Sequence, residues 1–458
     1  MPSRLLVRAV SALSLLLAGC QPPAVSTAVQ GELAVEPGAA QWRPMVVTDV
    51  TALRPAAPPD AAAELAEVKA WQARRTADDE KAIAYWNDQA APLRWSELSR
   101  DLVIKHGLVP PRAARALAMT HIAMYDAAIA TWDAKRAHRR AAPGQIEPGL
   151  KVLAGEAGVP SYPSEHAAIA YAAAAALAEV FPAEKDDLFA KARAAAETRV
   201  AAGANFRSDV TAGQAIGEAV ATAVIARARQ DGSDQKAQLP LVTQPGQWTH
   251  AAPMEPLAGH WKTWLVSSSD QFALQAPFGP GTPAHQASMA EVVAVGKALT
   301  AEQRATALKW NLDAPAVQWN DIARPIVAAK QQSTPAAART LAYLHALMAD
   351  TFITCWNTKY KVLLPRPTMA DTSFQSFVTT PPHPSYPSGH ASCSAAAATY
   401  LSAVFPDEAA GLNQNAEEAA MSRLYGGIHY RRDNDDGLGL GRAMGRFVAE
   451  RAQLDGRP

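Results

Sequence analysis

The sequence is poor in the features that mark membrane-spanning, disulfide-linked or nucleic-acid-binding proteins. It has three cysteines in 458 residues, and after its first twenty residues no apolar run is long enough to cross a bilayer. Lys plus Arg and Asp plus Glu both number 43, so no net charge draws the chain to nucleic acid or to an acidic membrane. Runs of alternating β-branched residues are also missing, which disfavours a β-sheet. Any basic site must therefore be a local cluster.

The first residues form a targeting segment. A basic stretch, MPSRLLVR, precedes a short apolar stretch, AVSALSLLL, and Leu17-Ala18-Gly19-Cys20 then resembles a bacterial lipobox. We predict a signal peptide over residues 1–19 and lipidation of Cys20, so that an exported protein is held in the bacterial cell envelope through its lipid alone. The alternative is an ordinary signal peptide with an incidental cysteine. For Cys355 and Cys393 we expect two buried free thiols rather than a disulfide or a metal site.

The rest of the chain is dominated by an internal duplication. Residues 76–232 and 300–456 align with a constant spacing of 224 residues and no net gap. PSYPSEH at Pro160 matches PSYPSGH at Pro384. The other matched pairs are Trp86/Trp310, Trp95/Trp319, His121/His345, Asp126/Asp350, Trp132/Trp356 and Lys135/Lys359. Because the copies differ at few polar positions, these differences separate what the fold needs from what the chemistry needs.

Both copies carry the pattern of helices. Each begins with a capping pattern, at Thr76 and at Thr300, and continues through segments rich in Ala, Leu and Met. Small side chains permit close helix packing, so we predict an all-α fold of two tandem, duplicated helical bundles with four to six helices each. The first bundle is expected at 76–232 and the second at 300–458.

Two segments fall outside the bundles. Residues 20–75 are rich in Ala and Pro and are predicted to tether the lipid to the folded body, with a short helix near Ala61–Arg74. Residues 233–299 combine Pro and Gly, which argue against long helices, with aromatic side chains, which argue against disorder. We expect this insert to pack on the bundles and to form a wall over a site.

Three polar clusters in the second copy suit a tetrahedral oxyanion. They are Lys359 with Arg366-Pro367, then Pro387-Ser388-Gly389-His390, then Ser422-Arg423 with His429 and Asp433. The three cations can neutralise a multiply charged anion, and a glycine at a helix start offers a backbone N–H at close range. Two histidines can serve as nucleophile or ligand and as acid/base, and Asp433 can orient His429.

Each cluster also has a purely structural interpretation. Basic side chains near a helix end are often solvated, Ser-Gly is a common N-cap, and a histidine on an Ala-rich helix is usually a core residue. The pattern K-x6-R-P, P-S-G-H and S-R-x5-H-x3-D, however, resembles the type 2 phosphatidic acid phosphatase and vanadium haloperoxidase superfamily at every key position. The resemblance implies that His429 is the nucleophile or the vanadium ligand and that His390 is the acid/base. It further implies that the oxyanion is held by Lys359, Arg366, Ser388, Gly389 and Arg423.

The motif does not choose between the two reactions of that superfamily. We favour a haloperoxidase-like enzyme, with vanadate as cofactor and halide and hydrogen peroxide as substrates, because the body lacks transmembrane helices. In addition, His383, seven residues before His390, resembles the arrangement in algal bromoperoxidases. The alternative is an acid phosphatase that hydrolyses phosphate esters through a phosphohistidine and needs no cofactor, and a further one is a non-catalytic oxyanion-binding lipoprotein. The physiological substrate and the oligomeric state stay open.

The first copy departs from this pattern at three positions. It keeps Lys135, Ser164, His166, Arg199 and Asp209. It has Ala142, followed by Pro143, in place of Arg366, Glu165 in place of Gly389, and Asn205 in place of His429. A carboxylate repels a bound anion and is expected to pair with Lys135 or Arg199, and Asn is no nucleophile. We therefore predict that the first bundle is catalytically silent and packs against the second.

Overall fold

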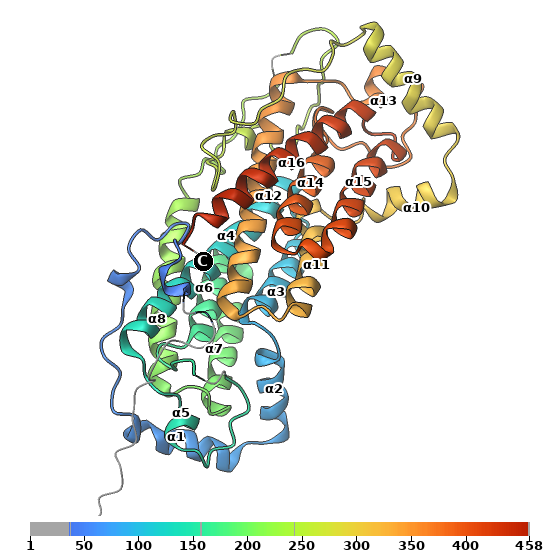
Figure 1. The fold of residues 1–458 in the computed structure, drawn as a ribbon. Helices are drawn as coiled ribbons and strands as arrows, with labels where there is room; N and C mark the ends of the chain where they lie inside the picture. The colour runs from blue at the N-terminus through green and yellow to red at the C-terminus, as the bar shows by residue number, and fades with distance from the viewer. Residues whose placement is uncertain (1–35, 37, 156–157, 242, 457–458) are drawn as a thin grey trace, which may run out of the picture.

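The computed structural model describes residues 36, 38–155, 158–241 and 243–456, so the predicted signal peptide and Cys20 lie outside the described residues. Within these ranges the chain forms helices and loops without a β-strand, which confirms the all-α prediction (Figure 1). None of the helices in this part of the chain has the length and apolar character needed to cross a membrane. Cys355 and Cys393 are buried free thiols, as predicted.

The helices within the two copies correspond one to one, and α1 precedes the first copy. The helices of the first half are α1 (Ala61–Arg74), α2 (Ala77–Asn87), α3 (Ala91–Lys105), α4 (Pro110–His138), α5 (Pro143–Ile146), α6 (Glu165–Val180), α7 (Lys185–Ala201) and α8 (Arg207–Ala228). Those of the second half are α10 (Ala301–Lys309), α11 (Pro315–Ala329), α12 (Thr334–Val362), α13 (Pro367–Ala370), α14 (Gly389–Val404), α15 (Ala409–Tyr425) and α16 (Arg431–Gln453). Thus α2 to α8 repeat as α10 to α16. Among the described residues each copy has seven α-helices, one more than the expected upper limit of six, and α5 and α13 are four residues long.

Small residues let the helices of each bundle approach closely. A Cβ built on Gly217 of α8 would lie 2.3 Å from the carbonyl oxygen of Ala168 in α6. At the equivalent place, a Cβ on Gly441 of α16 would lie 2.2 Å from the carbonyl oxygen of Ser392 in α14. Only glycine fits at such a contact, because any side chain would push the two helix backbones apart. The duplicated glycines therefore belong to the fold rather than to the chemistry.

The two bundles meet along α4 and α12, at a buried polar cluster that contains equivalent residues of the two copies. The rings of His121 and His345 stack with centroids 3.9 Å apart. Ser96 donates to Asn320 Oδ1 at 2.7 Å, and each of these side chains also contacts the Nε2 of the histidine from its own copy. Burial lowers the pKa of His121 to about 4, so the stacked ring is neutral at pH 7.

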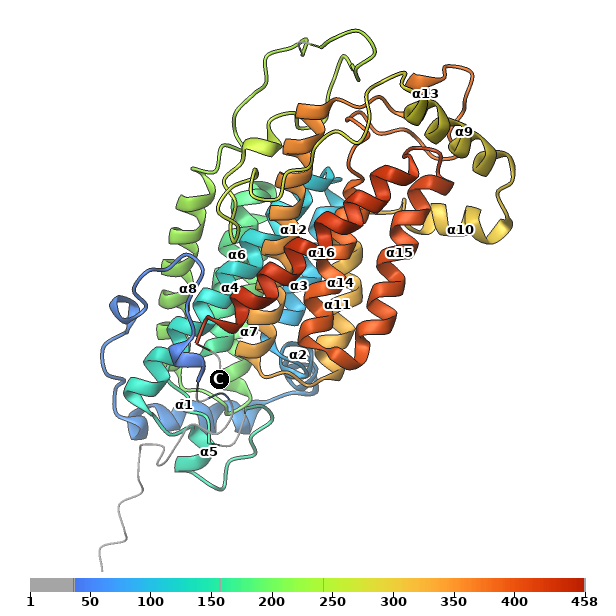
Figure 2. The ribbon, with the colours of Figure 1, turned by 45° about the horizontal axis from the view of Figure 1, so that its top comes forward.

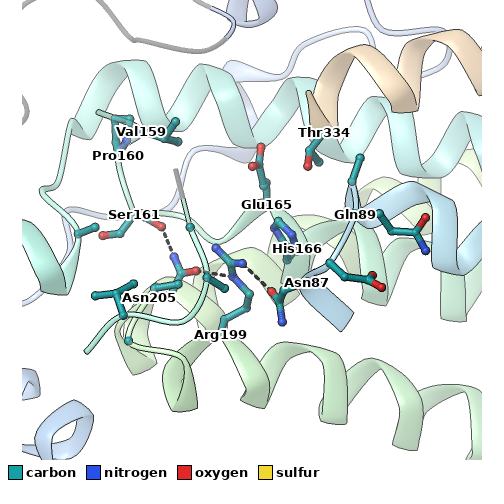
Figure 3. Close-up of a pocket in the computed structure, with 18 of the residues that line it drawn as sticks. Asn87, Gln89, Val159, Pro160, Ser161, Glu165, His166, Arg199, Asn205 and Thr334 are labelled. Carbon is teal, nitrogen blue, oxygen red and sulfur yellow. Dashed lines mark hydrogen bonds between the residues drawn. The ribbon is translucent and has the colours of Figure 1, made fainter. Parts of the chain in front are cut away.

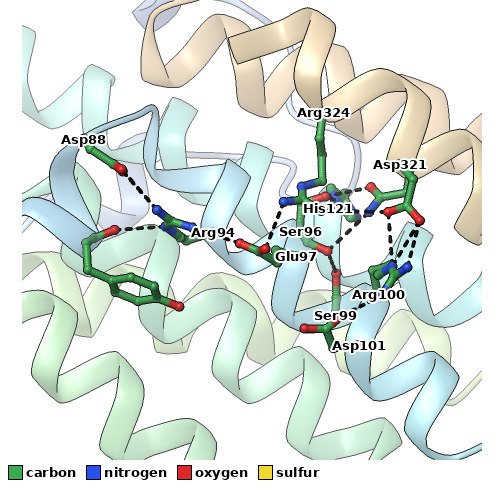
Figure 4. A network of polar contacts seen from close by, with 12 residues as sticks. Asp88, Arg94, Ser96, Glu97, Ser99, Arg100, Asp101, His121, Asp321 and Arg324 are labelled. Carbon is green, nitrogen blue, oxygen red and sulfur yellow. Dashed lines mark hydrogen bonds and ion pairs between the residues drawn. The ribbon is translucent and has the colours of Figure 1, made fainter.

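Ion pairs at the edge of the same interface join the bundles further. Arg100 of α3 binds Asp321 of α11 at 3.0 Å, and Arg324 of α11 lies 3.4 Å from Glu97 of α3 (Figure 4). The predicted packing of the first bundle against the second is therefore confirmed, and it uses residues from both copies.

The segments before each bundle also repeat, which the sequence did not suggest. The carboxylate of Asp126 accepts three backbone N–H groups from residues 45–47, and that of Asp350 accepts three from residues 264–266. Burial raises the pKa of both carboxyl groups to about 6. The prediction that residues 20–75 form a tether is therefore wrong for residues 45–47, because the backbone of these residues is bound to Asp126 of α4.

The insert differs from the prediction in one respect. It contains a long helix, α9 (Pro283–Lys297), although its Pro and Gly content argued against one. The helix forms because Thr282 caps it and Pro283 occupies its first position, where a missing N–H costs nothing. The expected short helix at Ala61–Arg74 is present as α1. In Figures 1 and 2 the insert runs along the second bundle, with α9 at its outer end.

Candidate functional site

The three sequence clusters of the second copy come together, although they start from different helices. Lys359 lies near the end of α12, Arg366 caps α13, and Ser388 caps α14. Arg423 is in the last turn of α15, and His429 lies in the turn before α16. Hydrogen bonds join the clusters, because Arg366 donates to the carbonyl oxygen of Ile428, next to His429, and the backbone N–H of Ser388 donates to the carbonyl oxygen of Asp433 at 2.9 Å. The structure thus assembles the set that the spacing predicted.

Three cations are buried in this site. Lys359 and Arg366 have no exposed surface, and Arg423 is 1% exposed. Burial lowers the pKa of Lys359 to about 7, that of Arg366 to about 10 and that of Arg423 to about 9. Their protein partners are mostly neutral oxygen atoms: Lys359 donates to the carbonyl groups of Pro384 and Ser385 at 2.7 Å each. A buried excess of positive charge is costly unless an anion compensates it.

The only carboxylate among the predicted site residues already has partners of its own. Oδ2 of Asp433 lies 2.8 Å from Nδ1 of His429 and accepts from Ser385 Oγ at 2.5 Å. It also accepts the backbone N–H of Tyr430 at 3.2 Å, which caps α16. Burial raises the pKa of Asp433 to about 6. The contact places the proton of His429 on Nδ1, so Nε2 carries the lone pair that a nucleophile or ligand needs.

The start of α14 supplies the remaining predicted groups. Ser388 Oγ accepts the backbone N–H of Ala391 at 3.4 Å, so the structural interpretation as an N-cap holds for its hydroxyl. Gly389 opens the helix, where unpaired backbone N–H groups favour an anion. Nε2 of His390 is buried and has no hydrogen-bond partner among the described residues. Burial first, and the charge of Arg423 second, hold the pKa of His390 well below 6.5. A bound anion would offset both effects.

His383 is tied to the site through Arg366. Arg366 donates through Nε to the carbonyl oxygen of His383 at 2.9 Å and lies 2.9 Å from its Nδ1. The His383 ring also contacts Trp356, with centroids 4.8 Å apart. The insert supports this corner, because the carbonyl oxygen of Met254 accepts from both Trp356 and Tyr360. The insert therefore packs against the end of α12 that carries Lys359, while a wall over the site stays a prediction.

Sequence comparison missed two of the groups that hold the site. Ser385, the donor to Asp433, is present in both copies as Ser161 and so looked structural. Met254 acts through its backbone, which no side-chain pattern reveals. A signal for Ser385 did exist, since it lies inside the matched PSYPS segment directly before the helix that carries His390.

In the first copy the equivalent groups bind one another. Arg199 donates to Asn205 Oδ1 at 3.0 Å and to Asn87 Oδ1 at 2.6 Å. Asp209 accepts from Arg140 at 2.8 Å, whereas the equivalent Asp433 of the second copy contacts His429. The alignment of the two copies shows that Ala142 replaces an arginine. It did not reveal the role of Arg140, because the equivalent residue of the second copy is Leu364.

A cavity of about 740 Å³ adjoins this first-copy cluster (Figure 3). Lys135, Glu165, His166, Arg199 and Asn205 line it, together with residues from the loop between α11 and α12 of the second bundle. None of the predicted site residues of the second copy lines this cavity. Glu165 Oε2 accepts from the Trp132 indole N–H at 2.5 Å. The expected ion pair of Glu165 with Lys135 or Arg199 stays a prediction.

Comparison with known proteins agrees with the duplication. The family model for the PAP2 superfamily matches residues 120–232 and again residues 339–455, together half of the chain. The chain belongs to the PAP2 superfamily. Both matched stretches begin within the long central helix of a bundle, α4 or α12, and reach its last helix. No curated protein sequence matches.

Solved structures with the same PAP2 architecture include bacterial vanadium-dependent enzymes. The first bacterial vanadium-dependent iodoperoxidase is 23% identical, with a TM-score of 0.64 over 78% of this chain and 95% of that one. A bacterial vanadium-dependent chloroperoxidase in its apo form is 15% identical, with a TM-score of 0.58 over 77% of this chain and 96% of that one. At these identities the likeness shows the fold.

Proposed function

We propose that this chain is a vanadium haloperoxidase-like enzyme whose second bundle holds a tetrahedral oxyanion. The observation that carries the proposal is the burial of Lys359, Arg366 and Arg423 beside one carboxylate that is already bonded. The residues present fit vanadate, because the site has excess positive charge and a helix N-terminus at Gly389. His429 would hold the vanadium, and vanadate, when bound, supplies the activation of peroxide that halide oxidation requires.

The chain's own residues have separable tasks in this scheme. Asp433 keeps the proton of His429 on Nδ1, so that Nε2 faces the anion as a base. Lys359, Arg366 and Arg423 neutralise the anion's oxygen atoms and hold them in place. His390, neutral in the free protein because of its burial, can accept a proton when the anion arrives and return it to a leaving oxygen.

An acid phosphatase is the second candidate, because the same residues support it. In that reaction His429 attacks the phosphorus atom, the ester oxygen leaves with a proton from His390, and water then releases phosphate from the histidine. The structural neighbours that are vanadium-dependent enzymes favour the first candidate. So does the contact of His383 with Arg366. A non-catalytic oxyanion-binding protein is the third candidate.

One experiment separates these candidates. The protein lacking residues 1–20 is assayed with and without added vanadate, for phosphate release from an aryl phosphate and for peroxide-dependent bromination. We expect vanadate to create the second activity and to inhibit any of the first, and His429→Ala to abolish turnover. A phosphatase whose vanadate-loaded form brominates nothing would exclude the haloperoxidase. Full activity in His429→Ala would refute the site, and phosphate binding without either activity would favour the third candidate.

The envelope location is also a proposal. The signal peptide would direct export, and lipidated Cys20 would then attach the protein to a bacterial membrane through lipid alone, while halide and peroxide, or a phosphate ester, reach the site from solution. Replacement of Cys20 by Ser should release the chain from the membrane fraction. A Cys20→Ser protein that stays with the membrane would show that another segment anchors it.

A further inference from the structure

Three large apolar side chains are exposed on the surface next to the second-copy site. Leu308 of α10 is 52% exposed, Leu312 in the turn after α10 is 77% exposed, and Phe377 in the loop before α14 is 36% exposed. Together they form what we call the apolar rim. A single exposed leucine is common, whereas a group of exposed apolar side chains indicates a surface that a ligand or partner covers.

The members of the apolar rim come from two segments that pack on each other. Ala307, which precedes Leu308, shares a buried apolar cluster with Val378. Phe377 directly precedes Val378 in the sequence. The guanidinium of Arg304, one helical turn before Leu308, lies 5.1 Å from the centre of the Phe377 ring. Leu308 and Phe377 therefore belong to one surface.

This surface adjoins a cation of the oxyanion site. The helix α10 packs on α15, which carries Arg423 (Figures 1 and 2). Arg423 donates through Nη2 to the carbonyl oxygen of Ala307 at 3.1 Å and through Nη1 to Oδ1 of Asn311 at 3.2 Å. Asn311 is exposed, whereas Arg423 is 1% exposed, so this contact joins the surface to the buried site. The two acceptor residues directly precede Leu308 and Leu312 in the chain.

The first copy does not carry the two leucines. It has Ala84 at the position of Leu308 and the charged Asp88 at the position of Leu312. The contact between an arginine and an asparagine beside these positions is nevertheless present in both copies. The leucines are therefore required neither by the fold nor by that contact, and they occur in the copy that keeps the oxyanion residues. The third member of the rim, Phe377, has an apolar counterpart in the first copy.

We propose that the apolar rim binds the organic part of the substrate on which the second-copy site acts. The inference rests on the proposed function and adds a substrate class, an organic molecule whose aromatic or alkyl group lies on Leu308, Leu312 and Phe377 beside the reacting group. For the haloperoxidase this molecule is the halogen acceptor: a C–H bond, one halide, one peroxide and one proton give a carbon–halogen bond and two waters. For the phosphatase it is the ester, which water cleaves to an alcohol and phosphate.

Two oxyanions that differ in one group test the binding. The protein lacking residues 1–20 is titrated in a calorimeter with phenylphosphonate and with methylphosphonate, at an acidic pH at which both are monoanions and Lys359 is charged. We expect phenylphosphonate to bind about tenfold more tightly, because about 60 Å² of ring surface placed on the rim contributes about 25 cal/mol per Å².

Molybdate, titrated in parallel, separates this inference from the proposed function. No binding of molybdate or of either phosphonate would refute the oxyanion site, and the inference would fall with it. Binding of molybdate without a preference for phenylphosphonate would overturn the inference alone.

A double variant locates the preference on the rim. Leu308→Gln combined with Leu312→Asn keeps the side chains at a similar size and introduces no charge. The affinity ratio of the two phosphonates should fall from about tenfold to about twofold. Leu454→Asn is the matched control, because Leu454 is 74% exposed and lies at the opposite end of α16 from His429. A ratio that survives in the double variant, or that falls equally in the control, would overturn the proposal.

Kinetics with the same double variant shows which substrate carries the organic group. With vanadate and peroxide, the KM for phenol should rise about fivefold while the KM for bromide stays unchanged. In a phosphatase, the KM for phenyl phosphate should instead rise relative to that for methyl phosphate. Unchanged KM values for both organic substrates would overturn the proposal. So would phosphatidylglycerol vesicles that bind the natural rim but not the double variant, in the absence of a phenyl preference, because the rim would then contact a membrane.

Discussion

Replacement of Asp433 by Asn tests how far the second-copy site depends on the carboxylate behind His429. The substitution keeps the volume of the side chain and replaces a charge-assisted hydrogen bond, 2.8 Å long, by a neutral one. A hydrogen bond to a charged group is stronger than a neutral one by roughly 1 kcal/mol. Loss of such an orienting partner commonly lowers activity by roughly 10–100-fold. We expect kcat to fall by that factor and KM to change less.

The same substitution should not unfold the protein. Burial raises the pKa of Asp433 to about 6 from 3.8, so the ionised form opposes folding at neutral pH, and its removal relieves that cost. The lost contacts with Ser385 and Tyr430 act in the opposite direction. Urea denaturation of the variant should therefore show a modest change in the free energy of unfolding, while steady-state kinetics shows the large loss.

The duplication provides the control for this experiment. Asp209 is the equivalent residue of the first copy, where it accepts from Arg140 instead of a histidine. Asp209→Asn should lower stability, because Arg140 loses its buried ionised partner, and it should leave kcat unchanged. The reasoning is refuted if Asp433→Asn retains the kcat of the natural protein or if Asp209→Asn lowers kcat equally.

Three further predictions concern other parts of the molecule. His390→Ala should lower turnover by roughly 100-fold or more while oxyanion affinity, measured by calorimetry, changes little, and an equal loss of affinity would contradict its role as acid/base. Because the pKa of Lys359 is lowered to about 7, it is charged below that pH and neutral above it. The affinity for molybdate should therefore fall by up to about tenfold per pH unit above pH 7, and Lys359→Met should remove this dependence. Asn320→Leu, which leaves Ser96 and His345 without their partner, should lower the free energy of unfolding by about 1–3 kcal/mol in urea, and no loss would show that the cluster is dispensable.

Much of the fold could be predicted because the duplication acts as an internal alignment. Helices α2 to α8 and α10 to α16 follow from Ala-rich stretches and capping patterns that occur twice. The repeat of residues 45–47 as 264–266 was missed, because the two segments share little sequence and dock through their backbones. Their common feature is visible only from Asp126 and Asp350, which hold them.

The part of the site that depends on the types of its side chains could be predicted from the sequence. Lys359, Arg366 and His429 stand in a spacing that predicts an oxyanion site. The sequence comparison missed a contact in which an arginine at a nearby position replaces the arginine that the first copy lacks. Arg140 pairs with Asp209 in the first copy although its counterpart in the second copy is a leucine, so a position-by-position comparison showed a lost arginine and hid its replacement.

The central claim is that one of the two copies binds a tetrahedral oxyanion and that three positions decide which one. Gly389→Glu gives the second copy the carboxylate of the first. A Cβ at Gly389 would contact Trp356 at 3.4 Å, so Gly389→Ala should weaken binding less and separates volume from charge. Calorimetric titration with molybdate is the most direct measurement. We predict one site per chain in the natural protein and none in Gly389→Glu, whereas two sites per chain, or a site that survives Gly389→Glu, would contradict the account.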